Sequence, residues 1–283
     1  MTTTRRTIRS ILVPTDFSDA ADIAFVHALR LAIALKAELE IFHVEPRNDT
    51  ADWHWAPSVI NTLVRWGFLP SGAGPADVSA LGIRARHAMA TGSSPEHAIR
   101  AELAASHADL VVVATHGRSG LARWLQPSVA MPVAVRGAVP VLVIPQGAKG
   151  FVDAETGYAA LSRVLVPVDH VPHPAPGFDA ATLLTMALPG PSVELATIHV
   201  GGGTPDLVWM RPAPGWALHH WSAEGDVLEN LQEVIREWGP DVVVAVSEGR
   251  RNFLDVLRGS TVERLLDRSP RPVLVVPAEW GLA

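Results

Sequence analysis

The chain of 283 residues contains no cysteine, which excludes disulfides, thiolate metal sites and a cysteine nucleophile. Positive charge is also scarce: 23 lysines and arginines stand against 29 aspartates and glutamates, so the net charge is −6. Proteins that bind nucleic-acid backbones normally present a basic face, so we expect no nucleic-acid partner. No stretch approaches about 18 uninterrupted apolar residues, and the N-terminus lacks the apolar core of a secretory signal. We therefore expect a soluble, cytoplasmic protein with no membrane partner.

The chain does contain an internal duplication, because four blocks of sequence occur twice in the same order. Each block and its repeat are ILVPTD (11–16) and VLVPVD (164–169), ELEIFHV (38–44) and ELATIHV (194–200), DLVVVATHGRSG (109–120) and DVVVAVSEGRRN (241–252), and PVLVIP (140–145) and PVLVVP (272–277). Fewer residues separate a block from its repeat in the last two pairs than in the first two, so the second copy is shorter. We expect a first domain at 1–147, a linker at 148–160 and a shortened, degenerate second domain at 161–283.

Short β-rich apolar runs alternate with helical patterns in the first copy. Expected strands are 10–16, 38–44, 82–90, 109–114 and 140–145; expected helices are 18–37, 57–68, 94–108 and one between the last two strands. Five strands joined by four helices predict a parallel, doubly wound sheet. The fold class is therefore α/β, with two tandem, Rossmann-like, five-stranded domains. In the second copy, prolines delay the first helix to about Gly177, and residues 200–215 offer little regular structure.

Two loops of the first copy follow strands that should be neighbours in such a sheet. Pro14, Thr15 and Asp16 end the first strand, and Thr115 ends the fourth, just before a glycine-containing loop. Ligands of open parallel sheets bind at the carboxyl ends of strands where strand order reverses. Glycines allow backbone N–H groups to approach phosphate oxygens, and a facing carboxylate can bind ribose hydroxyls or a divalent cation. The cleft suits a nucleotide.

These motifs, in this order along nearly the whole chain, resemble those of the universal stress protein family. The resemblance implies a tandem member with an adenine-nucleotide α-hydrolase-like fold, acting as a stress-response regulator or sensor. One class of the family binds ATP and another does not, so membership alone leaves binding open. The implied cofactor is ATP, with or without Mg²⁺. The alternative is a scaffold that binds no nucleotide and acts through protein partners.

The resemblance carries the family's nucleotide-binding roles onto both copies, position by position. Asp16 would meet the ribose or a metal, Val44 would line the adenine pocket, and a glycine loop would wrap the phosphates. The full candidate set is Pro14, Thr15, Asp16, Val44, Thr115, Gly117, Arg118, Gly120, Ser128 and Val129 in the first copy, and Asp169, Val200, Gly249, Arg250, Gly259, Ser260 and Thr261 in the second.

Each copy departs from the family's pattern at a different place. In the first copy Pro127 stands where the family usually has glycine, which removes a backbone donor from the phosphate loop. In the second copy Asn252 replaces the second loop glycine, and Glu248 would place a carboxylate beside the phosphates. We expect the first copy to bind a nucleotide in preference to the second.

Other chemistry has weaker support in the residues. The twelve histidines show no helical ligand spacing with a nearby carboxylate, so no metal site is expected. No catalytic base is evident, so we expect no enzyme, although slow ATP hydrolysis is compatible with the motifs. The apolar edge segments 140–145 and 272–277 would be exposed if unpaired. In the family the matching strands pair between subunits, which implies an intramolecular pseudo-dimer here, with a homodimer of whole chains left open.

Overall fold

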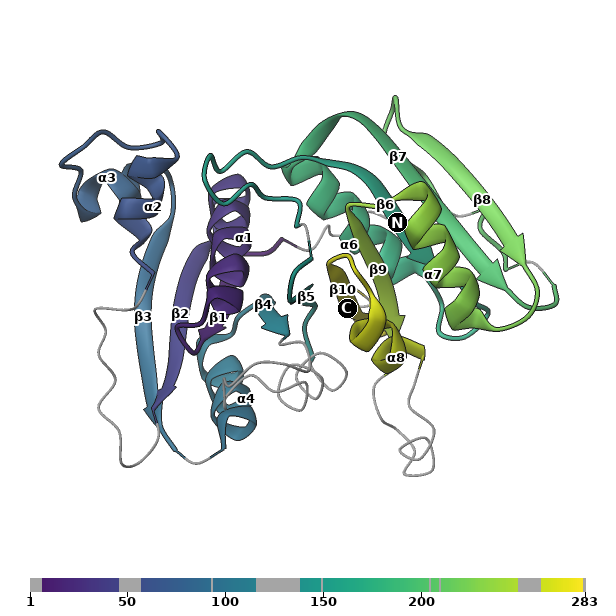
Figure 1. Cartoon of the computed structure of the whole chain (residues 1–283), viewed down its shortest axis with the longest axis horizontal. Coiled ribbons are helices and arrows are strands. Elements are labelled where there is room, and N and C mark those ends of the chain that lie inside the picture. The colour runs from purple at the N-terminus through teal and green to yellow at the C-terminus, as the bar shows by residue number, and fades with distance from the viewer. Residues whose placement is uncertain are drawn as a thin grey trace. The chain divides into compact units, whose positions relative to one another are not determined.

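The computed structural model of the chain describes residues 7–45, 57–92, 94–115, 138–148, 150–203, 205–208, 210–248 and 261–281. These residues form two compact units, whose elements are labelled in Figure 1. The first unit contains the described residues up to Thr115 together with Val152–Ala159. The second contains residues 138–151, which include the fifth strand, and the described residues from Ala160 onward.

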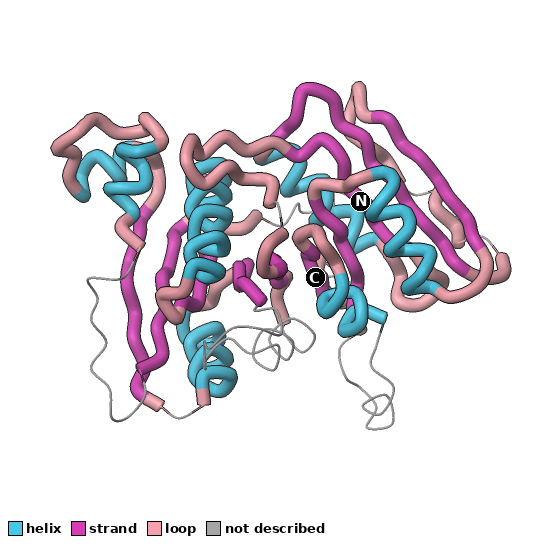
Figure 2. Tube along the Cα trace, viewed as in Figure 1, coloured by secondary structure: helices cyan, strands magenta, loops and turns pink. Residues whose placement is uncertain are grey.

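The first unit is a parallel sheet with strand order β3-β2-β1-β4. Its elements are β1 Ser10–Thr15, α1 Asp19–Leu35, β2 Glu38–Glu45, α2 Val59–Arg65, α3 Pro75–Ala80, β3 Arg84–Thr91, α4 Pro95–Ser106 and β4 Leu110–Thr115. The strands and helices expected from the sequence over 10–114 are confirmed, while the short helix α3 was not predicted. Figure 2 shows the alternation of strands and helices.

Local sequence explains where the helices of the first unit begin. Ser18 caps α1 by accepting a hydrogen bond from the Ala21 N–H at 3.2 Å. Ser94 caps α4 in the same way, and Pro95 occupies its first turn, where a missing N–H costs nothing. The apolar residues of β1 and β4 are buried on both faces, as continuous apolar runs predict.

Residues Val152–Ala159, which we call the strap, pack against the first unit although they follow β5 in sequence. The indole Nε1 of Trp66 donates to the Ala154 carbonyl at 2.9 Å, and Arg30 Nε donates to the Gly157 carbonyl at 3.0 Å. The ends of the strap meet in an antiparallel bridge between Val152 and Ala159. Part of the segment expected as a linker is therefore a docked loop.

The second unit is a mixed sheet with strand order β5-β10-β9-β6-β7-β8. Its elements are β5 Val141–Pro145, β6 Leu161–Pro167, α6 Ala175–Ala187, β7 Pro189–Val200, β8 Ala217–Ala223, α7 Val227–Trp238, β9 Val242–Ser247, α8 Thr261–Arg268 and β10 Val273–Pro277. All pairings here are parallel except β5 with β10, in which Leu142 lies opposite Leu274. The expected pairing of these two apolar strands is confirmed, and it makes the sheet mostly rather than wholly parallel.

Proline placement in the second unit differs slightly from the expectation. Helix α6 begins at Ala175, two residues before Gly177, because Pro174 takes the cap position and Pro176 lies in the first turn. Residues 205–208 and 210–215 contain no helix or strand, as expected. Among the helices within the described ranges, none has both the length and the apolar character needed to cross a membrane.

Candidate functional site

The carboxyl ends of β1 and β4 are adjacent in the first unit, as the nucleotide hypothesis requires. Ile11 lies opposite Leu110 and Leu12 opposite Val111 in a parallel ladder. The chain runs outward from β1 through β2 to β3 and then returns to the other side of β1 as β4. This reversal of strand order is where open α/β sheets bind ligands. Asp16, which follows β1, and Thr115, which ends β4, therefore lie at strand ends that meet at the switch point. Both strands are labelled in Figure 1.

A narrow crevice at these strand ends brings together four of the predicted residues. Its lining is Pro14, Thr15, Asp16, Phe42, His43, Val44, Pro95 and Ile99. The sequence analysis did not assign the other four to the site: Phe42 and His43 of β2, and Pro95 and Ile99 of α4. The approach of α4 to the strand ends is a tertiary feature that no local pattern indicates. The crevice has an apolar wall and one carboxylate at Asp16, and its volume is only about 10 Å³, the space of a single water molecule. The lining side chains therefore converge at the strand ends without forming a nucleotide-sized pocket among the described residues.

The loop after β1 is held by hydrogen bonds of its own. Asp16 Oδ1 accepts from the Ser18 N–H at 3.1 Å and from the Ser18 hydroxyl at 2.6 Å. Phe17 has a positive φ of 62°, and its N–H donates to Thr15 Oγ1 at 3.0 Å. The Phe17 ring stacks on His43 with centroids 4.3 Å apart. Asp16 thus has a structural role at the start of α1 beside any role in binding.

The predicted phosphate-binding residues of the first copy, Gly117, Arg118, Gly120, Ser128 and Val129, lie outside the described residues, as does Pro127. Thr115, the last described residue before them, ends β4 half-buried. The structure thus describes the half of the predicted site formed by the β1 loop and the β2 end. In the second copy Gly249, Arg250, Gly259 and Ser260, together with Asn252, also lie outside the described residues.

In the second copy, Asp169 follows β6, Val200 ends β7 and Thr261 begins α8. Strands β6 and β9 are neighbours, so Glu248, which follows β9, lies on an adjacent strand end. The Asp169 carboxylate is exposed, and its Oδ1 accepts from the His170 N–H at 2.7 Å. One ligand atom from each of Asp169, His170 and His199 lies within 4.8 Å of the others, a cluster that the sequence analysis did not predict.

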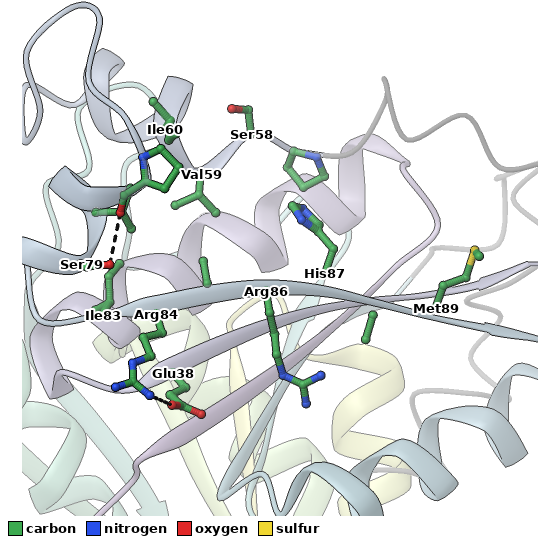
Figure 3. A pocket seen from close by; sticks show the side chains of 15 residues that line it. Glu38, Ser58, Val59, Ile60, Ser79, Ile83, Arg84, Arg86, His87 and Met89 are labelled. Atoms are coloured by element: carbon green, nitrogen blue, oxygen red, sulfur yellow. Dashed lines mark hydrogen bonds and ion pairs between the residues drawn. The ribbon is translucent and has the colours of Figure 1, made fainter.

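A larger groove of about 1140 Å³ lies on the first unit, formed by β3, α2 and α3 (Figure 3). The exposed Arg84 forms an ion pair with Glu38 at 3.4 Å along its rim. His87 and Met89 also line the groove. It runs along the outer strand rather than at the β1 and β4 ends, so it is separate from the predicted nucleotide site.

One buried carboxylate next to β3 has a strongly perturbed proton affinity. The Glu40 side chain is 2% exposed, and its Oε2 lies 2.8 Å from Arg86 Nη2. Burial and the neighbouring Glu102 raise the pKa of Glu40 to about 7, and Arg86 only partly opposes them. Glu40 points from the middle of β2 and is not part of the crevice lining, so we attribute the shift to packing.

Comparison with known proteins supports the fold over the full length. The model of the universal stress protein family matches residues 7–145 and 217–277. A universal stress protein from Archaeoglobus fulgidus DSM 4304 is 20% identical, with a TM-score of 0.66 over 96% of this chain and 97% of that chain. A functionally unknown protein from Pseudomonas aeruginosa PAO1 is 18% identical, with a TM-score of 0.63 over 95% of this chain and 92% of that chain.

A universal stress protein solved in complex with cAMP is 27% identical and covers 50% of this chain and 98% of its own, with a TM-score of 0.33. No curated protein matches the chain significantly. The family model matches well over half of the residues, in two separate segments that fall in the two copies of the duplication. The chain therefore belongs to the universal stress protein family, a family of stress-response proteins.

Proposed function

We propose that this protein is a cytoplasmic stress-response regulator or sensor that binds an adenine nucleotide, ATP, at the strand ends of its first copy. The observation that supports this most directly is that the carboxyl ends of β1 and β4 meet at the switch point. Asp16 and Val44 lie there, beside the strand that leads into the glycine loop. The residues at this site would bind the nucleotide, and none of them is assigned a catalytic role.

Each residue has a role that follows from its chemistry. Val44, near the end of β2, would line the adenine pocket, and the Asp16 carboxylate would accept hydrogen bonds from ribose hydroxyls. Gly117 and Gly120 would allow backbone N–H groups to approach the phosphates, with Arg118 supplying positive charge and Ser128 and Val129 closing on them. If Mg²⁺ accompanies ATP, Asp16 is the carboxylate at this site that would hold it.

The second copy is the weaker candidate for a nucleotide. Asp169, Val200, Gly249, Arg250, Gly259, Ser260 and Thr261 occupy the corresponding positions. Glu248 follows the neighbouring strand, and its carboxylate would repel a polyphosphate. We therefore place the nucleotide in the first copy. Pairing of whole chains into a homodimer is compatible with this assignment.

Titration of ATP into the full-length chain tests the proposal, with mass spectrometry of any ligand released on denaturation. Gly117→Asp places a side chain and a negative charge where the backbone should approach the phosphates, so it should lower ATP affinity by roughly tenfold or more. Gly249→Asp is the matched control in the second copy and should have the smaller effect.

The reverse ordering of these two variants would place the nucleotide in the second copy. Wild-type protein that binds no adenine nucleotide, whether added or co-purified, would overturn the proposal. It would favour the alternative of a scaffold that acts through protein partners.

A further inference from the structure

Asp169, His170 and His199 gather at the carboxyl ends of β6 and β7, within the second unit. One ligand atom from each residue lies within 4.8 Å of those from the other two, and Asp169 Oδ1 lies 3.9 Å from His199 Nδ1. The two imidazole rings are edge to face, with centroids 5.4 Å apart. His199 is 3% exposed, whereas Asp169 and His170 are exposed. The cluster thus combines a buried base with two groups that an ion could reach from solvent.

The hydrogen bonding of His199 leaves one ring nitrogen without a partner. His199 Nδ1 lies 3.2 Å from the Val168 carbonyl oxygen, which can only accept, so Nδ1 carries the proton. Nε2 is then an acceptor, and it is buried with no hydrogen-bond partner among the described residues. A buried acceptor left in this state is unfavourable, whereas a bound cation would satisfy it. Metal-binding histidines are usually oriented by such an Nδ1–H bond to a carbonyl.

Three consecutive glycines, Gly201–Gly203, follow β7 and run beside both rings. A Cβ atom at Gly201 would lie 3.7 Å from His199 Nε2, and one at Gly203 would lie 3.3 Å from His170 Nε2. Gly203 also has a φ of +80°, which favours glycine. Both Nε2 atoms therefore face a backbone segment without side chains, which leaves space next to the two nitrogens.

The first copy provides an internal comparison for this cluster. His43 matches His199, and its Nδ1 contacts the Thr15 carbonyl at 2.8 Å, so the buried imidazole is oriented in the same way. At the position of His170, however, the first copy has Phe17, whose ring stacks on His43 at 4.3 Å. A single aromatic residue therefore distinguishes a packed ring pair in the first copy from a pair of potential ligands in the second.

We propose that Asp169, His170 and His199 bind a divalent transition-metal ion, which we assign as Zn²⁺. Two imidazoles and one carboxylate are ligands that Zn²⁺ accepts readily, and three protein ligands leave a fourth position for water or an added ligand. A hard cation such as Mg²⁺ prefers oxygen ligands and would gain little from the two nitrogens. This site is independent of the nucleotide proposed for the first copy.

The test is titration of Zn²⁺ alone into the tag-free, full-length chain after treatment with a chelator. We expect one Zn²⁺ per chain at this site, with micromolar or tighter affinity. His170→Phe installs the residue of the first copy and should weaken binding roughly tenfold or more, and Asp169→Asn should weaken it as well. Both side chains are exposed, so the variants should fold, which circular dichroism verifies. His97→Gln, at an exposed position on α4, is the control and should leave binding unchanged.

Cobalt provides a second readout, because Co²⁺ bound by imidazole and carboxylate ligands absorbs visible light. The absorption should appear with wild-type protein and be lost with His170→Phe. Absence of zinc binding in the wild type would overturn the proposal, as would binding that His170→Phe leaves unchanged. Neither result bears on ATP binding, since no nucleotide is present in the experiment.

Discussion

Gly157, in the strap, lies against the ring of Trp66. Its φ is +67°, and a Cβ atom added there would lie 2.7 Å from Cγ and Cε3 of Trp66. The Trp66 ring is 8% exposed and is fixed by its hydrogen bond to Ala154, so it has little room to move away. Gly157→Ala should therefore release the strap or destabilise the first unit.

The free energy of unfolding that Gly157→Ala should lose has two parts, and a control variant separates them. Placing alanine at positive φ costs about 1–2 kcal/mol, partly offset by the lower entropy of the unfolded chain. Overpacking against a fixed ring adds about 1–3 kcal/mol. Gly72 has a φ of +85° and no atom within 4 Å of an added Cβ, so Gly72→Ala carries only the first part. The difference between the two variants isolates the contact with Trp66.

Urea unfolding followed by circular dichroism measures the two costs, and hydrogen exchange locates the effect. The Gly157 N–H donates to the Asp153 carbonyl at 2.9 Å, and the Asp153 N–H donates to the Tyr158 carbonyl at 2.8 Å. Both amides should exchange faster in Gly157→Ala and at the wild-type rate in Gly72→Ala. Equal destabilisation by the two alanines, with unchanged exchange in the strap, would refute the docking of the strap on Trp66.

Two further predictions concern a buried carboxylate and the β5–β10 pair. Because the pKa of Glu40 is raised from 4.5 to about 7, the folded state keeps a proton that the unfolded state has lost, so this group lowers stability as the pH rises from 4.5 to 7. Glu40→Gln should remove this fall in the free energy of unfolding with pH and stabilise the protein by about 1–3 kcal/mol near neutral pH in unfolding experiments. Glu38→Gln, at an exposed position, should do neither. An unchanged pH dependence in Glu40→Gln would show that Glu40 is not its cause. Leu142 is fully buried opposite Leu274, so Leu142→Lys should cost about 3 kcal/mol or more in thermal or urea unfolding. Val208→Lys adds the same charge at a side chain that is 77% exposed and should cost almost nothing, and similar losses in both lysine variants would show that the pair is not a stabilising contact.

The sequence by itself determined most elements of the first copy and the recurring strands of the second. Continuous apolar runs predicted β1 and β4, since strands buried on both faces need apolar side chains at every position. The start of α4 followed from Ser94 and Pro95, whose capping chemistry is local. The exposed apolar edge of each copy, together with the strand pairing that the family resemblance implies, predicted that β5 pairs with β10.

Only the tertiary structure decided which side chains meet. Glu40 lies in the nearly continuously buried strand β2, where it meets Arg86 from β3, and Arg86 also lies 3.8 Å from Glu102 of α4. His170 and His199 are distant in sequence and have no helical ligand spacing. They come together because the parallel register of β6 and β7 places Pro167 opposite Ile198, so the next residues of both strands reach the same edge of the sheet. The hydrophobic pattern of each strand favours one register, but which residues then lie side by side depends on the strand that it pairs with, and that is decided by the tertiary fold.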